Sequence, residues 1–343
     1  MDNLTNRQRT ILGLVVREYV KVAEPVSSRA LVEHYGLGVS SATVRNELAR
    51  LEELGYLTHP HTSAGRVPTS QGYRRFVQEL LGEVELPLRE RRTITHQFSQ
   101  VPQGFNHWMP LAASVLAKAT SGASLVTAPQ AERVRYKHLQ LISTQGRVVL
   151  LVLVLQGGMV KQQMLDLVEP LDQTTLSEIS DRLNQSFNGM TADEIGKRID
   201  TLASFESDVA RLVADMMARA EMHALEPIYR DGLSEVLQQP EFAAGEEAQG
   251  VLRIVEEPAF LEMVLADVLG PEVGGVNVLI GGEGRWEELR ACSLVFVRYG
   301  VPDYATGALG VVGPTRMFYG RAISAVRFVA ALLSDLVYDM YAE

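Results

Sequence analysis

The first 60 residues combine apolar stripes at helical spacing with residues that cap helices. Thr5 and Gln8 have the spacing of a capping box, and an apolar stripe follows them. A second, short helix would be capped by Ser27 and ended by Gly36, and Ser40 would cap a third helix. The stripe of the first helix consists of Ile11, Leu12, Val15 and Tyr19. The pattern therefore predicts three short helices in succession.

A hairpin is predicted directly after the third helix. Residues 56–58 would form one strand, residues 60–65 a loop of turn-forming residues, and residues 66–68 the returning strand. A fourth helix, near QGYRRFVQELL, would close the unit. Three helices followed by a hairpin are typical of a winged helix-turn-helix domain, which we expect over residues 1–83.

The third predicted helix has small and hydrogen-bonding residues on the side away from its apolar face of Val44, Leu48 and Leu51. Hydroxyl and amide side chains can bond base edges or phosphates, and arginine can hold a guanine or a phosphate. The helix N-terminus itself also attracts phosphate. The candidate DNA-binding residues are Ser40, Ser41, Thr43, Arg45, Asn46 and Arg50 in this helix, with His59 and Arg66 in the hairpin.

The same pattern leaves a second interpretation open. Small units of three helices and a hairpin also serve as protein-docking modules that never contact DNA. Glu47, Glu52 and Glu53 would be unfavourable beside phosphates. From the pattern alone, DNA binding is favoured over an interaction-only winged helix, but both remain possible.

In the rest of the chain, the pattern of apolar residues and prolines predicts a connector, a sheet and a helical segment. Residues 84–110 contain three prolines and a cluster of arginines, and we interpret them as a helical or partly irregular connector. Strands follow over 136–167, where Val148–Leu155 is apolar on both faces and predicts a central strand covered on both sides. The chain turns helical from about 170, and the strand pattern resumes near 276. A methionine-rich stripe within the helical segment fits either ordinary core or a dimer contact.

Charge separates the N-terminal segment from the remainder. The 343-residue chain has a formal charge of -10, but residues 1–92 hold 13 Lys and Arg against 11 Asp and Glu, a charge of +2. The later residues hold 19 against 31, a charge of -12. Only the first segment is therefore suited to a polyanion, and only mildly.

Composition and motifs argue against an enzyme, a membrane protein or a metal site. No apolar run approaches the roughly 20 residues of a membrane span. The N-terminal residues lack the apolar segment of a signal peptide, and the single Cys292 allows no internal disulfide, so we expect a cytoplasmic location. The chain has no P-loop, H-E-x-x-H or G-x-S-x-G motif, so we expect no catalytic residues, no cofactor and no bound metal. Cys292 lies in an apolar strand and is interpreted as a core thiol.

Several long segments carry a more specific signal. They include LTNRQRTILGLVVREYV, EPVSSRALVEHYGLGVSSATVRNELARLEELGYLTHPHTSAGRVPTSQGYRRFV and, far downstream, GALGVVGPTRMFYGRAIS. These segments closely resemble the heat-inducible transcription repressor HrcA family, and the resemblance runs from residue 4 to about 338. Two separated matches in the right order are more specific than a helix-turn-helix pattern alone.

The resemblance implies an α+β multidomain chain. Its parts would be an N-terminal winged helix-turn-helix (1–83), a connector (84–110), a GAF-like α/β domain with an antiparallel sheet, split between 111–170 and 246–343, and an inserted, mainly helical dimerisation subdomain (171–245). It also implies a homodimer that binds double-stranded DNA at an inverted-repeat operator, the CIRCE element, upstream of chaperonin and often DnaK operons. The GroE chaperonin would modulate this repressor.

Two other functions remain open at this point. In the first, the chain is a winged-helix regulator whose GAF-like domain senses a small molecule. In the second, it is a chaperonin-associated adaptor that does not act on DNA. The sequence marks no ligand pocket, so no effector is predicted.

Overall fold

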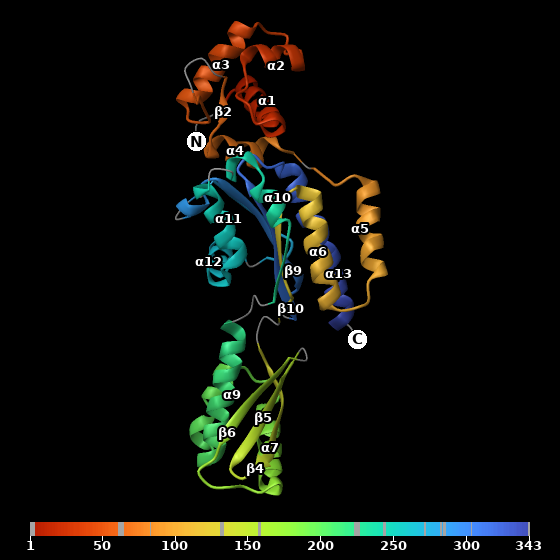
Figure 1. Cartoon of the computed structure of the whole chain (residues 1–343), viewed down its shortest axis with the longest axis vertical. Helices are drawn as coiled ribbons and strands as arrows, with labels where there is room; N and C mark the ends of the chain where they lie inside the picture. The colour runs from red at the N-terminus through yellow and green to blue at the C-terminus, as the bar shows by residue number, and fades with distance from the viewer. Residues whose placement is uncertain are drawn as a thin grey trace. The chain divides into compact units, whose positions relative to one another are not determined.

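The computed structural model describes residues 4–60, 65–82, 84–130, 134–156, 159–222, 227–242, 245–270, 272–281, 283, 286–302 and 304–341. The chain divides into two compact units. Unit 1 comprises residues 1–129, 227–300 and 307–343, and unit 2 comprises residues 130–226 and 301–306. Residues 130–226 are therefore a long insertion in the sequence of unit 1, and 301–306 add a short second piece to unit 2. Each unit can be followed separately in Figure 1.

Unit 1 begins with three helices and a two-stranded antiparallel hairpin. The helices are α1 (Asn6–Val22), α2 (Ser28–Tyr35) and α3 (Ser41–Glu53), and the strands are β1 (Leu57–Thr58) and β2 (Val67–Pro68). The predicted caps are confirmed: Thr5 and Gln8 form a capping box, and the side chains of Ser27 and Ser40 cap α2 and α3. Gly36 ends α2 with a φ of 55°, a conformation that glycine adopts without strain. The tip of the predicted hairpin, 61–64, lies outside the described residues.

The segment after the hairpin is mostly helical, which fits the helical or partly irregular connector expected over residues 84–110. A short helix α4 (Ser70–Arg75) continues into the π-helical turn η1 (Phe76–Leu80), where the fourth helix was predicted. Helices α5 (Leu88–Gln100) and α6 (Phe105–Thr120) follow. Because α6 begins at Phe105 and packs on strands of unit 1, the folded domain starts earlier than the expected residue 111.

A five-stranded sheet forms the centre of unit 1, in the order β7-β3-β10-β9-β8. Its strands are β3 (Ala123–Thr127), β7 (Ile228–Asp231), β8 (Val276–Ile280), β9 (Cys292–Val301) and β10 (Ala305–Pro314). Helices α6 and α13 (Tyr319–Tyr341) lie on one side of the sheet, and α11 (Glu246–Glu256) and α12 (Pro258–Val268) lie on the other (Figure 1). Short elements α10 (Leu233–Leu237), η3 (Pro240–Phe242) and η4 (Glu287–Leu289) complete the unit.

Glycines in β10 allow it to approach the aromatic residues of β9. A Cβ at Gly310 would meet the ring of Phe296 at 2.2 Å, and one at Gly307 would meet the ring of Tyr299 at 2.7 Å. Both rings are almost fully buried. The segment GALGVVGP is therefore glycine-rich because bulky neighbours occupy the space that side chains would need.

Unit 2 has its own core between a sheet and helices. The antiparallel sheet has the order β4-β5-β6, formed by β4 (Tyr136–Gln145), β5 (Val148–Leu155) and β6 (Val160–Asp166). The helical elements are α7 (Gln173–Phe187), α8 (Ala192–Gly196), η2 (Ile199–Thr201) and α9 (Ser204–Met222). The stripe Leu176, Ile179, Leu183 and Phe187 of α7 is buried in this core, as are Val209, Val213 and Met217 of α9.

The expected division of the sheet domain differs from the structure. Strands β4 to β6 share a core with α7 and α9, whereas the predicted boundary at 170 separated them. The insertion therefore spans 130–226 and contains a sheet, so the expectation of a mainly helical subdomain over 171–245 was wrong. Strand β7 also precedes the predicted return of strands near 276. The physical reason is that this sheet must bury an apolar face, and the amphipathic helices that follow it in the sequence cover that face.

Strand β5 is central, as predicted, but only one of its faces is buried. Its residues alternate between half-buried and buried, and Val149, Leu151, Leu153 and Leu155 face the helices. The opposite face is lined by Val148, Leu150, Val152 and Val154, which are half-buried. The expectation that both faces are covered was therefore wrong for the described part of the chain.

No helix in the described ranges has the length and apolar character needed to cross a membrane. The longest of the described helices, α13, buries Val326, Ala330, Leu333 and Val337 within unit 1.

Asn184 provides a test of how α7 is held to its sheet. Its carboxamide oxygen accepts bonds from the Tyr136 hydroxyl and the Leu139 N–H, both at 2.7 Å, and its amide donates to the Leu139 carbonyl at 2.9 Å. Asn184→Ala would leave these buried groups unpaired, so we expect it to lower the free energy of unfolding by about 2–4 kcal/mol. Urea unfolding followed by circular dichroism measures this change. Gln185→Ala, at the exposed neighbouring position, should change it by less than about 0.5 kcal/mol, and equal effects would contradict the role of Asn184.

Candidate nucleic-acid interface

Helix α3 is placed on the rest of the N-terminal segment by its apolar face. Val44, Leu48 and Leu51 are buried against the other helices, as the sequence predicted. The opposite side, with Ser41, Arg45 and Asn46, is exposed. The beginning of the helix is therefore open to a partner while its other face is fixed by packing.

The polar side chains at the start of α3 differ in whether they already form hydrogen bonds within the protein. The Ser40 Oγ accepts the Thr43 N–H at 3.2 Å and lies 3.0 Å from the Thr43 hydroxyl, so both side chains stabilise the first turn. Ser41, Arg45 and Asn46 form no side-chain hydrogen bond or ion pair with any described residue. These three side chains can therefore bond a partner without first breaking an internal contact.

The other three candidates are held by carboxylates. Arg50 is paired with Glu53 at 2.7 Å. Glu52 binds both remaining basic residues: it contacts the ring of His59 and lies 2.7 Å from the Arg66 guanidinium. These pairs fix the hairpin against the last turn of α3. They also reduce the positive charge that these residues present.

Arg66 has a second structural role. Its backbone N–H and carbonyl form a β-bridge with Val26, with both hydrogen bonds at 2.9 Å. Its side chain is only 23% exposed. The position therefore anchors the base of the hairpin to the chain before α2, in addition to any contact with a ligand.

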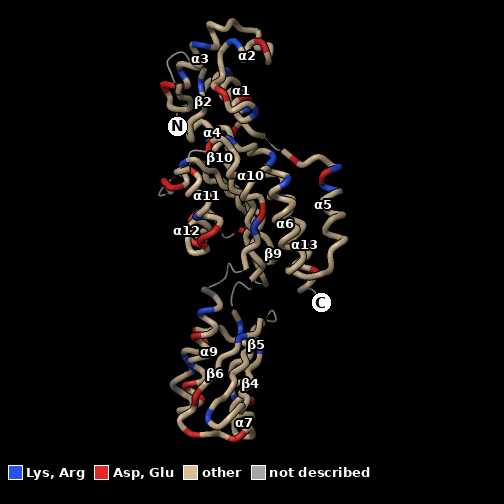
Figure 2. The backbone as a smooth tube through the Cα atoms, in the orientation of Figure 1, with Lys and Arg blue, Asp and Glu red and all other residues tan. Residues whose placement is uncertain are grey.

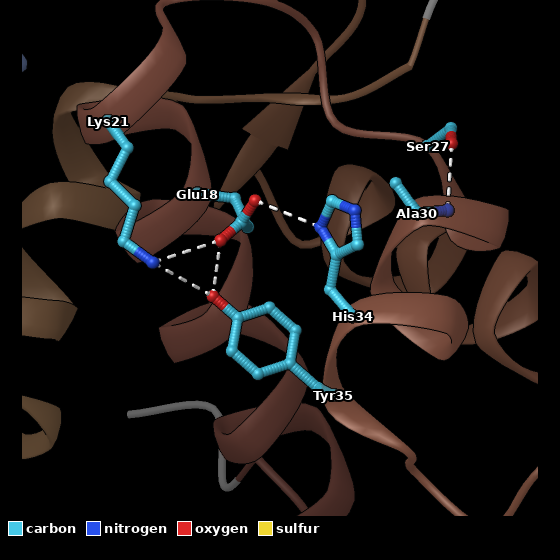
Figure 3. A network of polar contacts seen from close by, with 6 residues as sticks. All are labelled: Glu18, Lys21, Ser27, Ala30, His34 and Tyr35. Atoms are coloured by element: carbon cyan, nitrogen blue, oxygen red, sulfur yellow. Dashed lines mark hydrogen bonds and ion pairs between the residues drawn. The ribbon is translucent and has the colours of Figure 1, made fainter.

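A polar network between α1 and α2 has no clear signal in the sequence (Figure 3). The Glu18 carboxylate accepts a hydrogen bond from the Tyr35 hydroxyl and lies 3.2 Å from the Lys21 ammonium and 3.4 Å from the His34 ring. Its side chain is 13% exposed. The hydrogen bond from Tyr35, followed by those from Lys21 and His34, holds the pKa of Glu18 below its ordinary value. Spacing on α1 could have found Lys21, but nothing in the sequence pairs Glu18 with residues 16 and 17 positions later.

Contacts from α4 hold the N-terminal segment against the start of α13 and a residue that follows β8. The ring of Tyr73 packs against that of Tyr319, with centroids 5.8 Å apart. Arg74 forms an ion pair with Glu283. Burial raises the pKa of both tyrosines, so both hydroxyls stay protonated at neutral pH. Sequence reasoning missed this contact because its partners are more than 200 residues apart.

Charges of both signs are interspersed along the N-terminal segment and unit 1, as Figure 2 shows. Several of the basic residues in the N-terminal segment have acidic partners, including Arg7 with Glu47 and Arg29 with Glu33. Among the basic candidate residues, Arg50, His59 and Arg66 have acidic partners, whereas Arg45 has none among the described residues. A partner would bind such a surface through shape and hydrogen bonding more than through attraction to its net charge.

Comparison with known proteins identifies the family. A family model described as the HrcA protein C terminal domain matches residues 106–323. A protein from Herpetosiphon aurantiacus named Heat-inducible transcription repressor HrcA is 44% identical, over 99% of this chain and 97% of its own length. The chain belongs to the HrcA family. A relative of the same name from Roseiflexus castenholzii is 43% identical over 99% of this chain and 96% of its length.

A solved structure also resembles the whole HrcA-family chain. It is described as "Crystal structure of a hypothetical protein at 2.2 A resolution", with a TM-score of 0.58, 26% sequence identity and 98% coverage of both chains. This likeness supports a mixed α/β fold with antiparallel sheets. Both HrcA relatives are named as heat-inducible transcription repressors, which supports a heat-shock transcriptional repressor as the class of function.

Among the described residues, no group of three or more His, Cys, Asp or Glu could hold a metal ion. Cys292 is fully buried at the start of β9, and burial raises the pKa of its thiol to about 12. The thiol therefore stays protonated, as expected of a core residue.

Glu18 supplies a pH-dependent prediction. Folding lowers its pKa below the ordinary 4.5, so its stabilisation is present above that pH and is lost as the pH falls through the lower folded value. Glu18→Gln should reduce the free energy of unfolding by about 1 kcal/mol at pH 7, and the difference from the unaltered chain should shrink below pH 4.5. Urea unfolding at several pH values measures it. Glu33→Gln, in an exposed pair, is the control; a pH-independent Glu18 effect would contradict the interpretation.

Proposed function

We propose that this chain is a dimeric, sequence-specific transcription repressor of heat-shock chaperone operons. Its N-terminal segment would act as a winged helix-turn-helix that binds double-stranded DNA at an inverted-repeat, CIRCE-type operator. The GroE chaperonin would modulate its activity, and the protein would act in the cytoplasm. The operator and the chaperonin rest on the family resemblance, while the geometry supports DNA reading.

The observation that carries DNA reading is the exposed start of α3. Arg45 and Asn46 project from a helix whose opposite face is fixed in the core, and neither is engaged by a described residue. An arginine can bond a guanine edge and an asparagine an adenine edge in the major groove. The hairpin beside α3, fixed by Glu52, would follow the adjacent DNA backbone. Ser40, Ser41 and Thr43 would lie closest to phosphate at the helix N-terminus.

Because many basic residues in this segment have acidic partners, contacts to bases should contribute more to DNA binding than attraction between net charges. With a formal charge of +2 over residues 1–92, non-specific binding to phosphate should be weak. Two copies held in register would bind an inverted repeat much more tightly than one, because the second half-site is reached intramolecularly. A homodimer is therefore part of the same proposal.

The open face of the sheet in unit 2 supports a dimer contact. Across the three strands, Ile142, Leu150 and Met164 are register partners, and so are Val154 and Val160. Met164 and Val160 are 52% and 51% exposed. No described helix of unit 2 packs on this face, and Gln140 and Gln162 flank Val152 in the row between the two apolar rows. Exposed apolar side chains gathered on one face are typical of an interface, and a second copy would bury them.

We expect Arg45→Ala and Asn46→Ala to weaken operator binding, each by about 1–3 kcal/mol, because each would remove contacts to base edges. Fluorescence anisotropy titrations with a duplex from the chaperonin promoter region, at one fixed salt concentration, measure the loss. Arg211→Ala, which removes an exposed arginine of α9, should leave affinity unchanged. Unaltered binding by both α3 variants would exclude this helix as the reader.

We expect the double variant Val160→Glu/Met164→Glu to shift the protein from dimer to monomer. Both positions are more than half exposed, so the fold should tolerate the charges, whereas a second copy would have to bury them. Light scattering after size-exclusion chromatography reports the mass. Gln185→Glu adds a charge on the helical side of unit 2 and serves as the control. An unchanged mass for the double variant would place the dimer contact elsewhere.

A further inference from the structure

Helices α5 and α6 leave a groove between them. The side chains of Ile94 and Phe98 on α5 are each only 4% exposed and hold this helix in place. Towards the start of α5 a cavity of about 450 Å³ remains between the two helices. It is lined from α5 by positions four residues apart, 89, 93 and 97, and from α6 by 111, 114, 115 and 118. This size suits a small molecule.

The groove has an apolar floor and polar edges. Ile94, Leu111 and Val115 supply apolar surface. Arg89, Gln97, Ser114 and Lys118 supply polar groups, and the side chains of these four residues have no hydrogen bond or ion pair with any described residue. An apolar floor with a few uncommitted polar groups is the usual composition of a small-molecule site.

The charges in the groove favour an anion. Its one acidic lining residue, Glu90, is already paired with Arg321 at 2.6 Å. Arg89 and Lys118 have no such partner among the described residues, although the chain as a whole carries -10. Arg89 and Lys118 therefore bring two exposed cations, without acidic partners among the described residues, to the edge of one groove. A ligand with one negative group would complete this arrangement.

We propose that the groove between α5 and α6 binds a small monocarboxylate with an apolar ring or short chain. Arg89 and Lys118 hold the carboxylate, and the apolar body lies on Ile94, Leu111 and Val115. Gln97 and Ser114 lie along the polar edge of the groove. Inorganic phosphate would fill the charged end and leave the apolar floor exposed to water, so it binds less well. The proposal goes beyond the proposed function, because it concerns ligand binding that is measured without DNA.

Isothermal titration calorimetry of the full-length protein tests the proposal. The probes are benzoate, phenylacetate and octanoate, each compared with its neutral amide and with inorganic phosphate. We expect at least one carboxylate to bind with a one-to-one stoichiometry, and its amide to bind about tenfold or more weakly because charge-assisted hydrogen bonds are lost. Binding of none of the carboxylates, or equal binding of carboxylate and amide or of carboxylate and phosphate, would overturn the proposal.

Variants locate the site. Arg89→Gln and Lys118→Gln should each weaken the bound carboxylate about three- to tenfold. Arg92→Gln is the matched control, since Arg92 is an exposed arginine on the same helix that does not line the groove. Ser114→Phe should fill the cavity and abolish binding, and circular dichroism verifies that each variant is folded. Unchanged affinity in Arg89→Gln, Lys118→Gln and Ser114→Phe would place the ligand elsewhere and refute the assignment.

Discussion

The antiparallel pairing of β3 with β7 is the constraint on which the organisation of this chain depends. Ser124 to Thr127 pair with Asp231 to Ile228, so two segments about 100 residues apart lie side by side in one sheet. The Ser124 hydroxyl also donates to the Ala113 carbonyl at 2.7 Å and lies within bonding distance of the Asp231 carbonyl. The entropy cost of closing a loop grows only slowly with its length. The inserted residues 130–226 can therefore form a unit with its own core without breaking the parent sheet.

Local interactions made the N-terminal segment predictable from the sequence. The caps at Thr5, Ser27, Gly36 and Ser40 act within four residues, and the apolar stripe of α3 repeats at helical spacing. The exposed start of α3 follows directly from that spacing. The ion pairs of Glu52 with His59 and Arg66 were not predicted, because they depend on how the hairpin folds back onto the helix.

Long-range pairing explains what the sequence could not predict. Strand β7 is only Ile228–Asp231, and no periodicity in a stretch of this length distinguishes a strand from a helix. Its partner β3 determines its identity, and with it the end of the insertion. The apolar run Val148–Leu155 predicted a central strand correctly, but its pattern could not show that one side would lack a covering helix. Likewise, the groove between α5 and α6 depends on how these two helices face each other. The arginine cluster in residues 84–110 therefore could not predict this groove from the sequence alone.

Glu52 is the anionic partner of two basic residues in the N-terminal segment. It holds the hairpin residues His59 and Arg66 to α3 with the same kind of oxygen anion that a nucleic acid would present. A DNA strand approaching Arg66 would therefore exchange one anionic partner for another, and the gain in energy would be the difference between the two. If the segment binds DNA as proposed, the Glu52 carboxylate would compete with any backbone phosphate for His59 and Arg66. Discrimination between sequences would then fall to the uncommitted side chains at the start of α3.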